Sequence, residues 1–164
     1  MSTLVGTPRL VGRVMAATDK PSTADRVSRW AASLAERFEA ELVLLQVLMP
    51  GEPGITVLGR NQAAHVHLAA EELRRLAHHL AGERGRARIV VSTDPSTAII
   101  DAANTEGADV LVIGNSGMRD RRELLRLSVA NRVSHAAECT VVLVDTARTS
   151  GVRRRLGKLF GQAA

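Results

Sequence analysis

Aromatic residues are almost missing from this chain. They make up 2% of its 164 residues, and they are Trp30, Phe38 and Phe160, with no tyrosine. Proteins that bind single-stranded nucleic acid stack bases on several aromatic side chains, so the sequence argues against that class. The interior must instead be filled by aliphatic side chains and alanine, which the 45% hydrophobic content can supply.

The chain also has few cysteines and no long apolar run. Cys139 is the single cysteine and therefore cannot form a disulfide within the chain. Apolar runs such as Leu42 to Leu45 are about four residues long, whereas a helix needs roughly 20 to cross a bilayer. The first ten residues hold no apolar stretch of the kind found in secretory signals. We therefore expect a soluble, cytoplasmic protein.

The excess of positive charge is confined to one end. The formal net charge is +5, yet the body up to residue 147 holds all 17 acidic residues and an equal number of basic ones. The whole excess comes from five residues of the tail, namely Arg148, Arg153, Arg154, Arg155 and Lys158. The high isoelectric point thus describes a terminal segment and does not indicate a basic face on the folded body.

Short apolar segments alternate with longer amphipathic stretches along the body, and this alternation is typical of β-α units in a parallel sheet. The apolar segments predict five strands, at Arg13–Thr18, Glu41–Leu48, Arg86–Val91, Val110–Gly114 and Thr140–Asp145. A chain of this length without a linker makes one domain. We predict an α/β fold: an open, doubly wound, mainly parallel five-stranded sheet with four helices.

The helices follow from apolar residues at spacings of three and four. These spacings predict a first helix over 24–38 and a second over 63–80, after a loop from Met49 to Arg60 that is rich in proline and glycine. The two remaining helices are predicted to begin after capping residues, namely Asp94, followed by Pro95, and Ser128, followed by Val129.

In a doubly wound sheet, ligands bind beyond the carboxyl ends of the strands. The residues that the predicted strands deliver to that edge are Thr18, Asp19, Val47, Gly114, Asn115 and Gly117. Glycines at 114 and 117 let backbone N–H groups approach an anion, and the start of the helix after Ser128 would add free amides and a positive dipole end. A glycine turn before a capped helix is also what any α/β fold needs, so the pattern alone leaves both interpretations open.

The segment from Gly114 to Val144 resembles the signature of the universal stress protein family: Gly, two residues, Gly, nine residues, Gly, then Ser or Thr. The run from Gly107 to Gly114 and the first strand with Asp19 resemble that family too, so the likeness covers roughly residues 10 to 145. It implies an adenine-nucleotide α-hydrolase-like fold over 10–147, between a flexible start at 1–9 and a basic amphipathic tail at 148–164.

The resemblance also implies a ligand, which is ATP (with Mg²⁺) or another adenine nucleotide. It assigns Gly114, Gly117 and Ser128 to the phosphates and Asp19 to the ribose, and the binding residues it suggests in full are Thr18, Asp19, Val47, Gly114, Asn115, Gly117, Leu127, Ser128 and Val129. Leu127 departs from the pattern, because it stands where the family has its third glycine. We therefore expect weak nucleotide binding, or its loss.

The sequence shows no catalytic pair, and the spacing of its histidines does not suit a metal site. His65 and His67, for example, point to nearly opposite sides of a helix. We expect a non-enzymatic, stress-response regulatory module. Two alternatives remain open: a partner-docking domain that has lost nucleotide binding, and a nucleotide-hydrolysing enzyme on the same fold, for which Asp19 is the obvious carboxylate.

Two further expectations concern partners. The last strand is apolar from Thr140 to Val144 and, as a sheet edge, is expected to pair in a homodimer, as the resemblance also implies. The tail places Val152, Leu156, Leu159 and Phe160 on one side of a short basic helix. This helix could dock on the domain or bind an acidic partner, anionic membrane or nucleic acid; we predict external binding and no contribution to the fold.

Overall fold

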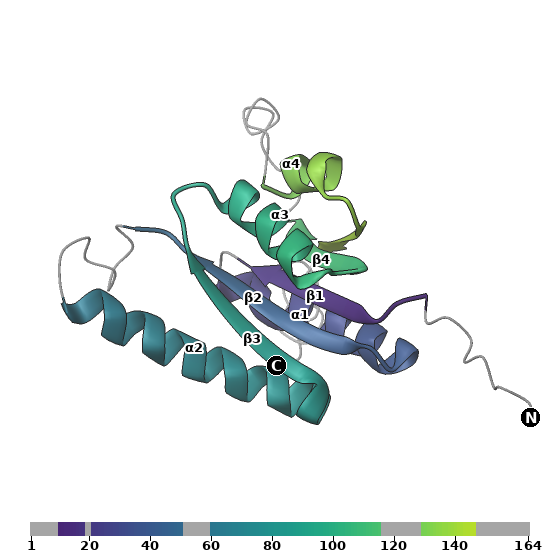
Figure 1. The fold of residues 1–164 in the computed structure, drawn as a ribbon, viewed down its shortest axis with the longest axis horizontal. Coiled ribbons are helices and arrows are strands. Elements are labelled where there is room, and N and C mark those ends of the chain that lie inside the picture. Colours follow the sequence, from purple (N-terminus) through teal and green to yellow (C-terminus); the bar gives the residue numbers. More distant parts are fainter. Residues whose placement is uncertain (1–9, 19–20, 51–59, 116–128, 147–164) are drawn as a thin grey trace, which may run out of the picture.

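The structure is a computed structural model, and it describes residues 10–18, 21–50, 60–115 and 129–146. The elements alternate between strands and helices along the chain (Figure 1). They are β1 (Arg13–Thr18), α1 (Pro21–Phe38), β2 (Glu41–Leu48), α2 (Arg60–Ala81), a 3-10 turn (Gly82–Arg84), β3 (Gly85–Val91), α3 (Pro95–Glu106), β4 (Val110–Asn115), α4 (Val129–Ala136) and β5 (Thr140–Asp145). The predicted doubly wound α/β fold is confirmed.

All five strands are parallel, in the order β3-β2-β1-β4-β5. The first half of the chain builds the sheet outward from β1 to β3, and the second half then starts again at β4 on the other side of β1. The point where the order reverses therefore lies between β1 and β4. Crossovers of this kind leave the two outermost strands, β3 and β5, as the edges of the sheet.

The sheet is buried on both faces because strand residues alternate between two clusters. On one face, Val14 and Ala16 of β1 pack with Val27 and Ala31 of α1 and with residues of α2. On the other face, residues such as Met15 pack with α3 and α4. Strands covered on both sides must be apolar at nearly every position, which explains the continuous runs seen in the sequence.

Four boundaries differ slightly from the sequence pattern. Strand β3 begins at Gly85 rather than Arg86, and β4 ends at Asn115 rather than Gly114. Helix α1 begins at Pro21, and α2 begins at Arg60, which the pattern placed in the preceding loop. Apolar periodicity detects only the buried stripe of a helix, so a polar first turn escapes it.

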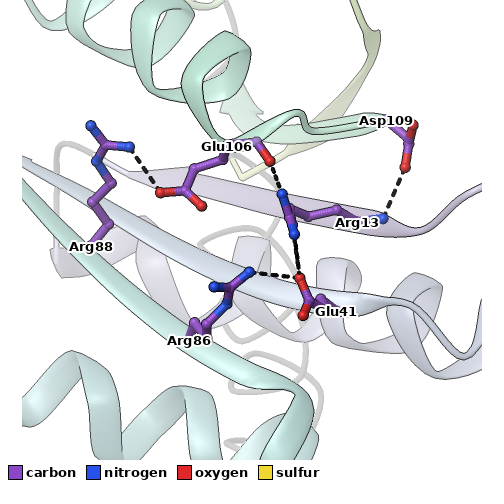
Figure 2. A network of polar contacts seen from close by, with 6 residues as sticks. All are labelled: Arg13, Glu41, Arg86, Arg88, Glu106 and Asp109. Atoms are coloured by element: carbon purple, nitrogen blue, oxygen red, sulfur yellow. Dashed lines mark hydrogen bonds and ion pairs between the residues drawn. The ribbon is translucent and has the colours of Figure 1, made fainter.

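A network of charged side chains holds the amino ends of the strands together (Figure 2). One carboxylate oxygen of Glu41 accepts hydrogen bonds from Arg13 Nε at 2.8 Å and from Arg86 Nη2 at 2.6 Å. Arg13 also donates to the backbone carbonyl of Glu106, and Asp109 accepts from the backbone N–H of Arg13 at 2.9 Å. The network thus links β1, β2 and β3 to the end of α3.

Candidate functional site

The switch point between β1 and β4 is the candidate site, because a crevice forms there beyond the carboxyl ends of the strands. Ala17 of β1 pairs with Ile113 of β4, and the next residues along the two strands are Thr18 and Gly114. Thr18 is 8% exposed, and Gly114 is partly exposed. A threonine and a glycine, both small residues, therefore lie side by side at the carboxyl ends of the two central strands.

Gly114 leaves room at this point of the strand. It continues the series Val110 and Val112, whose side chains are buried in the α1 and α2 cluster. A larger residue at position 114 would place its side chain on that same side, at the end of β4. With glycine, the backbone stays accessible at the rim of the sheet.

Helix α4 brings its N-terminus to the same edge, because it follows β4 and runs back antiparallel to the strands. Its first residue, Val129, is partly buried against the α3 and α4 cluster, and the next residue, Ala130, is 7% exposed. Packing of these two residues fixes the start of the helix on the sheet. The N–H groups of a first helical turn have no partner within the helix, and such a turn favours an anion.

A pair of charged residues anchors α4 from the side. Asp94 accepts hydrogen bonds from the backbone N–H groups of Ser96 at 3.1 Å and Thr97 at 3.3 Å, and so caps α3 as the sequence predicts. Both terminal nitrogens of Arg132 on α4 also reach the Asp94 carboxylate, each at 3.2 Å. These contacts lower the pKa of Asp94 below its ordinary value. The hydrogen bond from the Thr97 hydroxyl has the largest effect, and the one from Arg132 the next largest.

This contact was not visible in the sequence. Asp94 and Arg132 lie 38 residues apart, and nothing local to Arg132 distinguishes it from the other arginines. The capping role of Asp94 could be predicted from the following proline, but its second role, positioning α4 beside the crevice, is a product of the tertiary fold.

The residues suggested by the sequence fall into three groups. Thr18, Gly114 and the start of α4 at Val129 lie at the carboxyl edge, and Asn115 ends β4 opposite Asp145 of β5. Val47 also lies near that edge, but its side chain is 1% exposed and packs in the cluster that contains Ile99 of α3. Val47 can therefore face a ligand only through its backbone. The remaining residues, Asp19, Gly117, Leu127 and Ser128, lie outside the described part of the chain.

Other candidate chemistry is sparse in the described ranges. No three His, Cys, Asp or Glu side chains there gather closely enough to hold a metal ion. Cys139 packs partly buried against the α3 and α4 cluster, and burial raises the pKa of its thiol. None of the helices described here is long and apolar enough to cross a membrane.

Comparison with known proteins agrees with the resemblance seen in the sequence. The model of the universal stress protein family matches residues 11–145. The comparison with curated protein sequences found no match.

Solved structures of universal stress proteins share the fold. One in complex with cAMP is 24% identical, covers 83% of this chain and 98% of its own, and has a TM-score of 0.65. UspA from Lactobacillus plantarum is 20% identical, with 82% and 97% covered and a TM-score of 0.64. A universal stress protein from Archaeoglobus fulgidus in complex with dAMP is 25% identical, with 81% and 96% covered and a TM-score of 0.53.

Proposed function

The chain belongs to the universal stress protein family, and we propose that it is a non-enzymatic regulatory module that binds an adenine nucleotide at the switch point between β1 and β4. The observation that carries this proposal is the pairing of Ala17 with Ile113, which brings Thr18 and Gly114 together at the crevice. A family member from Archaeoglobus fulgidus that is 25% identical and has the same fold was solved with dAMP, which supports an adenine nucleotide as the ligand.

The groups at the crevice suit binding rather than catalysis. A threonine hydroxyl, the backbone beside a glycine and the first turn of a helix all hydrogen-bond to phosphate oxygens. None of these groups accepts a proton readily at neutral pH, so they do not act as a general base. A nucleotide-hydrolysing enzyme on this fold would need a carboxylate near the phosphates, and Asp19 is the residue that the sequence offers for that role.

The ligand is an adenine nucleotide with one or more phosphates, and with ATP the Mg²⁺ would enter bound to the phosphates. The comparison complexes hold nucleotides with one phosphate, cAMP and dAMP. Leu127, in place of the motif glycine, is expected to weaken contacts to a phosphate chain. It also favours the second candidate function, a partner-docking domain without nucleotide.

The proposal also concerns how the protein assembles with partners. We place a homodimer interface along β5, which is an outer strand of the sheet, and we expect the basic tail to be available to an acidic partner or surface. An apolar outer strand pairs readily with a second copy of itself in an isologous contact. A nucleotide-dependent change in this assembly would be the regulatory output.

Calorimetric titration of the full chain with AMP, cAMP and ATP with Mg²⁺ tests the ligand. We expect weak binding to the wild type, tighter binding to Leu127→Gly, and at least about tenfold weaker binding to Gly114→Asp, whose carboxylate would repel the phosphate. Thr93→Asp is the matched control, because it adds the same charge at the same edge of the sheet but beside β3. We expect it to leave the affinity unchanged.

Two results would contradict the proposal. If neither the wild type nor Leu127→Gly binds any of the three nucleotides, the partner-docking function is favoured. If Gly114→Asp and Thr93→Asp weaken binding equally, the nucleotide lies elsewhere and the effect is one of net charge.

A further inference from the structure

One strip of the sheet carries no helix of its own among the described residues. Neighbouring strands lie about 4.8 Å apart and a helix is about 10 Å wide, so one helix covers roughly two strands. On the face that carries α1 and α2, helix α2 contacts β2 and β3, and α1 packs chiefly on β1 and β4 and reaches β5 at its margin. On that face of β5, Thr140 is exposed and Val142 is partly exposed, whereas Val144 near the carboxyl end is 5% exposed.

The flank of α1 that borders this strip carries a large exposed apolar side chain, Trp30. In a right-handed β1-α1-β2 unit, the residues one position before the core-facing line of Val27, Ala31 and Ala35 point toward β4 and β5. These residues include Trp30, which is 50% exposed, and Leu34, which is partly buried against the core.

The opposite flank of α1 is consistent with this assignment of the two sides of the helix. Residues one position after the same line point toward β2 and α2, and Ser28 on that flank is only 3% exposed. Helix α1 contacts α2 there. The side of the helix with Ser28 is therefore covered by a neighbouring helix, whereas Trp30 on the other side stays half exposed. A large exposed apolar side chain next to a partly exposed strand is the kind of surface that another segment can cover.

The segment that leaves β5 has the right length and pattern to cover it. Val152, Leu156 and Phe160 repeat at i, i+4 and i+8, and Trp30, Leu34 and Phe38 repeat in the same way along α1. Each set spans about 12 Å along a helix. The five residues 147–151 suit a connection between a strand and a helix, which is most often two to six residues long. A helix begun there would run back along β5, parallel to α1.

We propose that residues 152–160 form a helix that docks against Trp30, Leu34 and Val142, and so covers the partly exposed part of β5. In this position the apolar side of the tail is buried and Arg154 and Lys158 face solvent. The basic charge stays available to an acidic surface, while the tail becomes part of the folded domain. This proposal replaces the expectation from the sequence that the tail contributes nothing to the fold. The proposal does not depend on nucleotide binding.

Trp30 is the single tryptophan of the chain and reports on its own environment. The test compares the full-length protein with the double variant Leu156→Asp and Leu159→Asp, which places charge on the docking side of the tail. Trp30 emission in the double variant should shift to longer wavelength, and its acrylamide quenching constant should rise roughly twofold, as expected when one side of a large aromatic ring is uncovered. Arg154→Gln, on the outward side, is the matched control and should leave both values unchanged.

Two further measurements separate the possible occupants. The Tm of the double variant should fall by about 2–6 °C, and neither the emission nor the Tm difference should weaken with added salt, because apolar burial holds the contact. If the double variant matches the wild type in emission, quenching and Tm, the tail does not dock there. If protection of Trp30 depends on protein concentration in both proteins, a second copy covers Trp30 and the proposal is wrong.

Discussion

The two edges of the sheet are protected in different ways. At β3, the face turned away from α2 carries Arg86 and Arg88, and each pairs with a carboxylate, Glu41 at 2.6 Å and Glu106 at 2.8 Å (Figure 2). At β5, apolar side chains are accessible on both faces: Val142 is partly exposed on the face toward α1, and Leu143 on the other face is 47% exposed. Charge on an edge strand discourages pairing with other chains, whereas an apolar edge invites it.

This difference indicates which edge of the sheet is more open to a partner. Strand β3 is protected by contacts within the domain. One of its faces packs on α2, and the arginines on its other face form salt bridges. Strand β5 keeps accessible apolar side chains, and the proposed homodimer and the proposed docking of the tail would both cover them. They are compatible, because the dimer would pair along the strand edge while the tail would lie on one face.

A charged residue on the β5 edge, like those on β3, should have the strongest consequence, because we expect it to separate the homodimer. Leu143→Lys adds a positive charge at a half-exposed position, so the fold should be retained while the dimer separates. The molar mass from light scattering should fall by half. Val91→Lys is the matched control, because Val91 is an exposed apolar residue, 37% accessible, on the β3 edge. Equal masses for Leu143→Lys and the wild type would place the interface elsewhere.

The next effect tests how tightly the β3 edge is packed on its helix. A Cβ at Gly85 would lie 2.1 Å from the backbone carbonyl oxygen of Ala77, so α2 would have to move away from β3. We expect Gly85→Ala to lower the free energy of unfolding by about 2–3 kcal/mol, measured by urea denaturation.

Gly12→Ala provides the control for Gly85→Ala. Its added Cβ would meet only Asp109 Oδ2, at an ordinary contact distance of 3.5 Å. We expect a change within about 0.5 kcal/mol, as for most surface substitutions. A similar loss in both variants would mean that glycine itself, and not the close approach of α2, matters at position 85.

Much of this architecture could be predicted from local sequence. The strands Arg13–Thr18, Glu41–Leu48 and Thr140–Asp145 were located to the residue by their apolar runs, and Asp94 with Pro95 located the start of α3. These signals are local because burial on both faces demands apolar residues, and a helix start demands a cap. The candidate edge of the sheet followed from the alternation of elements.

The remaining features depend on which segments the fold brings together. Glu41 meets Arg13 and Arg86 across 28 and 45 residues, and no local pattern announces such contacts. The sequence pattern began the third strand at Arg86, yet Gly85 is a strand residue that lies close to the backbone of α2. Val47 was placed correctly near the edge of the sheet, but its side chain belongs to the core. Asp19, Gly117, Leu127 and Ser128 stay predictions, because they lie outside the described residues.

The smallest effect concerns the charge that protects the β3 side. Hydrogen bonds from Arg13, which has the largest effect, and from Arg86 lower the pKa of Glu41 below its ordinary value of 4.5. Burial acts in the opposite direction but does not cancel them. A carboxylate with a lowered pKa in the folded state stabilises the fold above its unfolded pKa, and this stabilisation is lost as the pH falls through the folded value. The contribution of Glu41 should therefore be complete at neutral pH and disappear in acid.

Glu41→Gln tests this contribution. At pH 7 we expect the variant to lose about 1 kcal/mol of unfolding free energy, a modest amount because the Glu41 side chain is 42% exposed and solvent screens the pairs. Below pH 4.5 the stability of the wild type should fall toward that of the variant, so that the two curves converge. Glu72→Gln, which removes a carboxylate from the exposed side of α2, controls for net charge. If the unfolding free energies of Glu41→Gln and the wild type stay a constant distance apart as the pH falls, the charge of Glu41 does not stabilise the amino ends of β1, β2 and β3. The charged β3 edge would then be no more stabilised by its ion pairs than the apolar β5 edge is.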